Sequence, residues 1–81
     1  MFLPSLTFAC VKNAKAVQDL GKNLKRLRKA RGFSHQRLAD EADMAKSTVI
    51  KIEQAQMNAS VDLIFSLAHA LGIEPKELFD F

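Results

Sequence analysis

Four polar side chains near the middle of the sequence are of types that form hydrogen bonds with nucleic acids. They are Lys46, Ser47, Thr48 and Lys51. A lysine ammonium group can donate to guanine O6 and N7 or to a phosphate, and a serine or threonine hydroxyl can contact bases or phosphates. The same residue types are also typical of a solvated helix surface, so their meaning depends on the elements that position them.

Residues that could support catalysis or bind a metal are few and widely separated. The chain has one cysteine, Cys10, and two histidines, His35 and His69. These three residues show none of the close spacings that metal sites use, and no acid pair or glycine-rich loop accompanies them. His69 lies between two alanines, which is typical of a helix surface or an interface. The sequence therefore indicates a protein that is not an enzyme and has no cofactor or metal.

The charged residues are unevenly distributed along the chain. Up to Glu53 there are eleven lysines and arginines against five acidic residues, whereas from Gln54 onward Lys76 stands against four acidic residues. This asymmetry suggests that one face meets a polyanion while another meets solvent or protein. On charge alone, an ordinary solvated surface explains the pattern equally well.

Neither a membrane span nor a secretory signal is predicted. The sequence has no apolar run of about 18 residues or more, and the apolar opening segment contains Pro4 and lacks a preceding basic region. A lone cysteine cannot form an intrachain disulfide, which favours a reducing compartment. We therefore expect a cytoplasmic protein with no membrane contact. Residues 1–16, which include Phe2 and Phe8, are interpreted as an N-terminal apolar arm of unknown role.

From Val17 onward, apolar residues recur at helical spacing. Val17, Leu20, Leu24 and Leu27 form one stripe of a first helix that ends near Arg31. Similar patterns predict four further helices, over residues 35–42, 46–53 and 61–71 and from residue 75 onward. The predicted fold class is thus all-α, a compact five-helix domain over residues 17–81.

Residues with known preferences for helix ends separate these segments. Gly32 and Gly72 are expected to end helices, because glycine adopts the left-handed conformation that a helix end requires. Ser34 and Ser60 are expected to begin helices by accepting hydrogen bonds from free backbone amides, and Pro75 is favoured at a first helical position.

The predicted second and third helices are joined by only three residues. Two short helices so connected cross steeply, which is the geometry of a helix-turn-helix. Val49 and Ile52 are the expected buried residues of the third helix, which leaves its small polar and basic side chains on an exposed face. Such a face can enter the major groove of DNA, and the alternative is a solvated surface.

The segment from Leu20 to Phe79 resembles the Cro and phage-repressor type of helix-turn-helix protein, also called the XRE family. The matching positions are Leu27-Arg28, Gly32-Phe33-Ser34, Leu38-Ala39, Ser47-Thr48-Val49, Ile52-Glu53, Leu67-Ala68, Leu71-Gly72 and Leu78-Phe79. The resemblance implies a transcriptional regulator, a repressor, that binds double-stranded DNA sequence-specifically through a recognition helix over about residues 46–53.

The resemblance also implies a DNA-binding role for individual residues. Lys46, Ser47 and Lys51 occupy the base-facing positions of the recognition helix, and Thr48 lies near a phosphate or a base. His35 stands where many relatives have a glutamine that binds the DNA backbone at the start of the second helix. Histidine keeps a hydrogen-bond donor there and makes the contact sensitive to pH.

One pair of residues matches a structural feature of the family. Arg28 and Glu53 occupy positions that in several relatives form a partly buried salt bridge. The resemblance implies that this pair ties the first helix to the end of the recognition helix.

Several residues depart from the family pattern. Asp43 replaces the usual glycine of the turn, and we expect the turn to survive because aspartate tolerates left-handed backbone. Ala45 replaces a frequent serine, which removes a side-chain acceptor from the start of the recognition helix. Ala55 and Ala59 stand where glycine and proline are common, which predicts a different loop after that helix.

A symmetric homodimer is predicted, because one short recognition helix contacts few base pairs. Dimeric helix-turn-helix proteins bind two half-sites about 34 Å apart. The acidic half of the chain offers an apolar patch for a twofold interface. Its candidate residues are Phe65, Phe79 and Phe81, with His69 alongside.

A second class of function stays open, in which the chain is an antitoxin or another module that mainly binds a protein partner. The N-terminal arm favours this reading, because an exposed apolar segment usually has a partner. RNA binding is not indicated, since the aromatic residues form no stacking platform.

Overall fold

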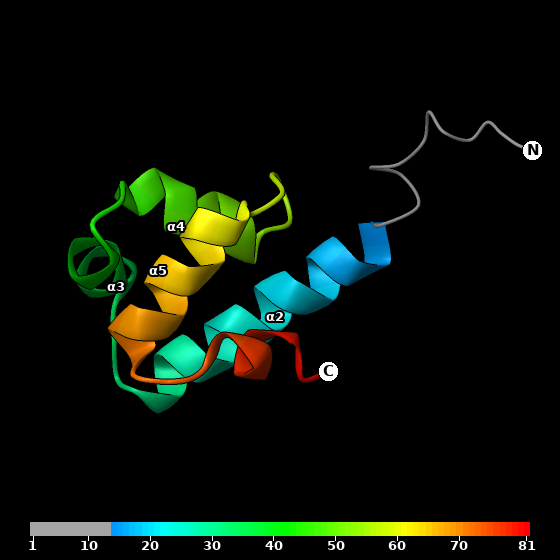
Figure 1. The fold of residues 1–81 in the computed structure, drawn as a ribbon. Helices are drawn as coiled ribbons and strands as arrows, with labels where there is room; N and C mark the ends of the chain where they lie inside the picture. The colour runs from blue at the N-terminus through cyan, green and yellow to red at the C-terminus, as the bar shows by residue number, and fades with distance from the viewer. Residues whose placement is uncertain (1–13) are drawn as a thin grey trace, which may run out of the picture.

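The computed structural model describes residues 14–81, which form α-helices and one 3-10 helix joined by short loops (Figure 1). The elements are α2 (Ala14–Ala30), α3 (His35–Ala42), α4 (Lys46–Glu53), α5 (Val61–Leu71) and the 3-10 helix η2 (Pro75–Phe79). The all-α prediction is confirmed for this part of the chain. Most of the N-terminal arm lies outside the described residues, and its last three residues, 14–16, form the first turn of α2 rather than part of an arm.

Two predicted boundaries of the five-helix scheme need correction. The first helix begins three residues before Val17, because Ala14, Lys15 and Ala16 extend it although none of them is buried. The fifth element is a five-residue 3-10 helix, so the described residues contain four α-helices. Pro75 begins this element, as predicted. Five residues allow few α-helical hydrogen bonds, and 3-10 helices are typical of segments this short.

The longest helix, α2, lies across one side of the molecule, and the other helices pack against it and one another (Figure 1). Helix α3 contacts α4 and α5, while η2 packs against both α2 and α5. The core between them is made of side chains that recur at helical spacing. Its fully buried large members are Leu24, Leu38, Val49, Ile52, Leu67, Leu71 and Leu78. No helix of residues 14–81 combines the length and the apolar character needed to cross a membrane.

The predicted helix ends agree with the structure. The Ser34 hydroxyl accepts a hydrogen bond from the Arg37 amide at 3.0 Å, and the Ser60 hydroxyl accepts one from the Leu63 amide at 3.2 Å. Gly72 adopts a left-handed conformation after α5. These caps are local contacts, because each joins residues only three positions apart, and they mark the starts of α3 and α5.

The turn between α3 and α4 follows from Asp43. This residue has φ 57° and ψ 50°, and the amide of the following Met44 donates to the carbonyl of Ala39 at 3.0 Å. Aspartate therefore provides the left-handed residue that reverses the chain, as expected. At the start of α4, Ala45 makes no side-chain cap hydrogen bond, so the first amides of α4 are left available for another acceptor.

Asn23 joins the C-terminal segment to α2, a contact that the sequence did not predict. Its side-chain nitrogen donates to the carbonyls of Glu77 and Leu78, both at 2.8 Å, and its side-chain oxygen accepts from Arg26 at 2.6 Å. Both carbonyls belong to η2, so this buried amide fixes the short helix that carries Phe79.

The end of α4 adopts a Schellman motif with alanine at its left-handed position. Ala55 has φ 59°, its amide donates to Ile52, and the next amide, of Gln56, donates to Lys51 at 2.8 Å. A left-handed conformation costs a residue with a Cβ about 1–2 kcal/mol. Glycine avoids this cost but loses more conformational entropy on folding, so its net advantage at this position is smaller.

We expect Ala55→Gly to raise the free energy of unfolding by about 0.5–1 kcal/mol, because glycine removes the Cβ penalty at this position. Urea unfolding measures the change. The matched control is Gly32→Ala, where φ is 73° and a new Cβ would meet nothing within 4 Å. It adds the same backbone strain and should lower stability by about 1 kcal/mol. A loss of stability in Ala55→Gly would contradict this account of the loop.

Candidate nucleic-acid interface

Helix α4 presents a polar face on the side away from the core. Val49 and Ile52 are buried, whereas Lys46, Ser47 and Lys51 are exposed. This division follows from the helical spacing, because the two buried residues share one face and the three exposed residues share the opposite one. The structure therefore brings three of the four predicted α4 contact residues onto one accessible surface.

The remaining residues of α4 refine this surface. Thr48 is half-buried at its flank and turns partly toward the protein. Ile50 is half-buried between Lys46 and Lys51, so the face has an apolar centre. Gln54, at the end of the helix, is exposed three residues after Lys51. The sequence prediction omitted Gln54, although its spacing from Ser47 and Lys51 places it on the same stripe.

A close crossing of two helices fixes the position of α4. A Cβ on Gly21 of α2 would lie 2.6 Å from the carbonyl oxygen of Ile52 and 2.7 Å from that of Glu53. Only glycine permits this approach of α2 to the last turn of α4. The contact brings Glu53 into reach of the side chains of α2.

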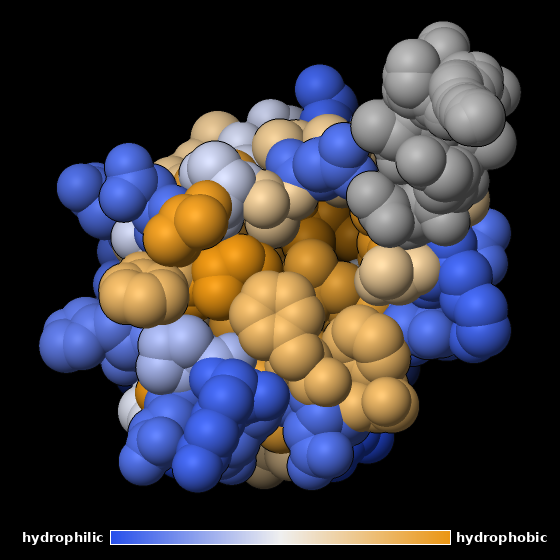
Figure 2. All heavy atoms as spheres, turned by 45° about the vertical axis from the view of Figure 1, so that its right-hand side comes forward, coloured by the Kyte–Doolittle hydropathy of each residue, from blue (hydrophilic) through white to orange (hydrophobic). Residues whose placement is uncertain are grey.

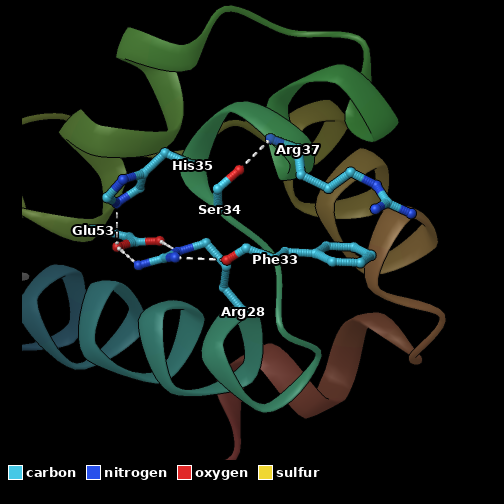
Figure 3. Close-up of polar contacts among 6 residues, drawn as sticks. All are labelled: Arg28, Phe33, Ser34, His35, Arg37 and Glu53. Carbon is cyan, nitrogen blue, oxygen red and sulfur yellow. Dashed lines mark hydrogen bonds and ion pairs between the residues drawn. The ribbon is translucent and has the colours of Figure 1, made fainter.

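Arg28 and Glu53 form the predicted pair between α2 and α4 (Figure 3). Nε of Arg28 donates to Oε2 of Glu53 at 2.6 Å and Nη2 donates to Oε1 at 3.2 Å, while Nη1 donates to the Phe33 carbonyl at 2.8 Å. The two side chains are only 7% and 4% exposed. The guanidinium thus holds three segments together: α2, the end of α4 and the loop that leads into α3.

His35 contacts the same carboxylate from the first turn of α3. Its Nε2 lies 3.0 Å from Oε1 of Glu53, and its side chain is 35% exposed. Figure 3 shows the imidazole directed at Glu53, on the side opposite Arg28. The sequence analysis gave His35 a contact with the DNA backbone alone. In the structure one ring nitrogen is instead engaged within the protein, and the sequence offered no signal for a contact across 18 residues.

The start of α3 is further ordered by stacking. The guanidinium of Arg37 lies 4.8 Å from the centre of the Phe33 ring and donates to Glu41 at 3.2 Å. A cation over an aromatic face is attracted to the negative potential of the ring. These contacts lie on the surface of α3 and leave the α4 polar face uncovered.

The predicted interface residues lie on the acidic half and are exposed. Phe65, Phe79 and Phe81 are 59%, 51% and 59% exposed, and His69 lies one helical turn after Phe65 on α5. Phe79 and Phe81 line a groove of about 240 Å³ together with Val17 and Leu20 of α2. We call Val17, Leu20, Phe79 and Phe81 the apolar face. Figure 2 shows hydrophobic side chains gathered on this side of the molecule with hydrophilic ones around them.

Most of the described residues match a known protein family. A family model described as helix-turn-helix matches residues 24–78. The chain belongs to the helix-turn-helix family. Its type is the Cro and phage-repressor, or XRE, type that the sequence resembles. Helices α3 and α4 lie within the matched residues and form the helix-turn-helix with Asp43 in its turn.

Similar proteins support the same assignment. The control protein C.BamHI of Bacillus amyloliquefaciens is 34% identical over 62 residues, which cover 75% of this chain and 76% of that protein. The restriction-modification controller protein C.AhdI of Aeromonas hydrophila has a crystal structure that covers 78% of this chain and 96% of its own, with 41% identity and a TM-score of 0.77. A hypothetical transcription factor from Neisseria, NHTF, matches at 25% identity with a TM-score of 0.76, covering 79% of this chain and 74% of its own. These relatives are regulators, in keeping with a function in DNA binding and transcription rather than in catalysis.

Proposed function

We propose that this protein binds double-stranded DNA sequence-specifically, with α4 in the major groove, and represses transcription as a homodimer. The observation that carries the proposal is the exposure of Lys46, Ser47 and Lys51 on the face of α4 opposite its buried residues. An α-helix fits the major groove of B-DNA, where each base pair presents a distinct pattern of donors and acceptors.

Each exposed side chain suits a particular kind of base contact. Lys46 and Lys51 can donate to guanine O6 and N7, and the Ser47 hydroxyl can either donate or accept. Ile50 can pack against a thymine methyl group, and the Gln54 amide can pair with adenine N6 and N7. Because Thr48 is half-buried, we assign it to the edge of the contact, near a phosphate.

The dimer would form through the side of the protein away from α4. A twofold interface needs one self-complementary patch, and the apolar face together with Phe65 and His69 provides it. Two copies joined in this way would present two α4 helices to successive major grooves, about 34 Å apart. The preferred DNA site should therefore contain two half-sites related by symmetry.

The target genes are proposed to belong to a restriction-modification system. Two relatives, C.BamHI and C.AhdI, are control proteins, and the second is named as a restriction-modification controller. The antitoxin alternative rests on the N-terminal arm, most of which lies outside the described residues.

Selection from random duplex DNA tests the proposal. The full chain without a tag, with bound duplex separated from free duplex on a native gel, should enrich one motif made of two inverted half-sites at moderate salt. A reporter carrying that motif over its promoter should then lose expression when the protein is present. Enrichment of no motif would refute sequence-specific binding, whereas enrichment with increased reporter expression would refute repression alone.

We expect Lys46→Ala and Lys51→Ala each to weaken binding to the selected duplex by about 1–3 kcal/mol, because each removes a base contact. Binding to random duplex should weaken less. Fluorescence anisotropy on both duplexes measures the difference, and Lys76→Ala is the control, since Lys76 is exposed on η2 in the acidic half. Equal losses on both duplexes would show that the two lysines contact phosphates only.

A further inference from the structure

The imidazole of His35 has one nitrogen committed to the interior of the protein. Nε2 lies 3.0 Å from Oε1 of Glu53, whose two oxygens also accept from Arg28 at 2.6 and 3.2 Å. An ionised carboxylate paired with a guanidinium accepts hydrogen bonds and donates none. The short contact between His35 and Glu53 therefore requires a proton on Nε2.

This requirement fixes the tautomer of the ring. A neutral imidazole carries one proton, and its other nitrogen is an acceptor. With the proton of the neutral ring on Nε2, Nδ1 has a lone pair and no hydrogen. Nδ1 can therefore donate a hydrogen bond only after the ring takes up a second proton.

His35 is placed where a DNA phosphate would approach. It is the first residue of α3, and its side chain is partly open to solvent. In a helix-turn-helix bound to DNA, the first helix crosses the sugar-phosphate backbone while the second lies in the groove. A phosphate oxygen at neutral pH accepts hydrogen bonds and repels a bare lone pair, so it cannot pair with the neutral form of this ring.

From this geometry we propose that His35 binds a DNA phosphate through Nδ1 only as the imidazolium, so that DNA binding and protonation of the ring favour one another. The inference rests on the proposed DNA-binding function and adds its regulation by pH. Glu53 is the positioning group, because it holds the ring by Nε2 and leaves Nδ1 for the phosphate.

The charged groups around the ring are consistent with this assignment. Glu53 of α4 contacts the imidazole directly, and Arg28 of α2 pairs with the same carboxylate. On α3 itself, Arg37 is engaged with Glu41, and Gln36 donates to Asp40. Among residues 14–81, no ion pair joins His35 to α5 or η2. A phosphate would thus be the second anion to face the ring.

The measurable consequence is a dependence of DNA affinity on pH. Histidine is the side chain that ordinarily changes charge between pH 5 and 8. Uptake of one proton should raise affinity as the pH falls through this range, by up to about tenfold per pH unit for each imidazole. A dimer with two such residues can reach about a hundredfold per pH unit.

The test uses the full chain and its selected duplex. Dissociation constants are measured by fluorescence anisotropy from pH 5.5 to 8.5 at constant ionic strength. His35→Gln should still bind and should lose most of the pH dependence, because the amide can donate to Glu53 and to a phosphate without gaining a proton. Lys76→Ala, exposed on η2 in the acidic half, is the control and should keep both the affinity and the slope.

Two further measurements separate the possible causes. Calorimetric titration of protein with DNA near pH 7, in buffers of different ionisation enthalpy, counts the protons taken up and should give a smaller number for His35→Gln. An NMR spectrum that correlates the ring nitrogens with the protons on the ring carbons identifies the tautomer. The proton of the neutral ring should be on Nε2.

The outcomes distinguish this inference from the function on which it depends. If the protein binds its duplex but His35→Gln keeps the full pH slope, or if the neutral ring carries its proton on Nδ1, the inference is overturned and DNA binding stands. If no duplex is bound at any pH, both are overturned. Loss of the slope and of the proton uptake in His35→Gln alone supports both.

Discussion

Glu53→Gln is expected to lower the free energy of unfolding by about 3–5 kcal/mol, the largest effect on stability predicted for this protein. The substitution keeps the size of the side chain and removes its charge, which leaves the Arg28 guanidinium buried without a counter-charge. Only 7% of the Arg28 side chain is exposed, so water cannot replace the lost partner. The glutamine amide also directs a donor at groups that are themselves donors.

The consequence for the fold should be severe. A domain of this size has about 4–12 kcal/mol of stability in total, at about 0.05–0.15 kcal/mol per residue. The loss therefore removes a large fraction of that stability. Urea unfolding followed by circular dichroism measures it, and an early transition or an unfolded baseline in water would both agree with the prediction.

A matched control separates burial from charge. Arg37 and Glu41 form an ion pair on α3 whose side chains are 61% and 47% exposed. An exposed pair of this kind contributes less than about 1 kcal/mol, so Glu41→Gln should cost little. A double-mutant cycle on Arg28 and Glu53 completes the test. Similar losses of unfolding free energy in the two glutamine variants, or an absence of coupling in the cycle, would show that the buried Arg28–Glu53 pair does not stabilise the fold.

The sequence predicted the features of this fold that depend on local chemistry. Ser34 and Ser60 begin their helices and Gly72 follows α5 because hydroxyl caps and left-handed residues act within three or four positions of themselves. The polar face of α4 was also predictable, since the buried and exposed residues of a short helix follow from its period.

Contacts between distant segments were harder to predict from the sequence. The Arg28–Glu53 pair spans 25 residues, and only the family resemblance indicated it. Nothing in the sequence showed that His35 would join this pair, or that Asn23 would bind the carbonyls of η2. Such contacts depend on how helices cross, and the crossing of α2 and α4 depends on Gly21, whose role is visible only when the neighbouring carbonyls are in place.

The second large effect concerns assembly. We expect the double substitution Phe79→Ser with Phe81→Ser to convert a dimer into a monomer and to lower affinity for the two-half-site duplex by about 100- to 10,000-fold. The factor is the gain that a second linked binding event normally provides. Both phenyl rings are more than half exposed in the monomer, so the substitutions remove little of the core, which depends instead on the fully buried Leu78.

The measurements must separate assembly from DNA contact. Mass in solution is followed across a dilution series, with and without DNA, and affinity is measured for the full site and for a single half-site. The double variant should lose dimer mass and full-site affinity while its half-site affinity stays the same, because α4 is untouched. Lys76→Ala, on the same 3-10 helix, should remain dimeric. If the double variant stays dimeric, the interface does not depend on Phe79 and Phe81. If the wild-type protein is monomeric at every concentration and binds one non-palindromic site, the dimer itself is refuted.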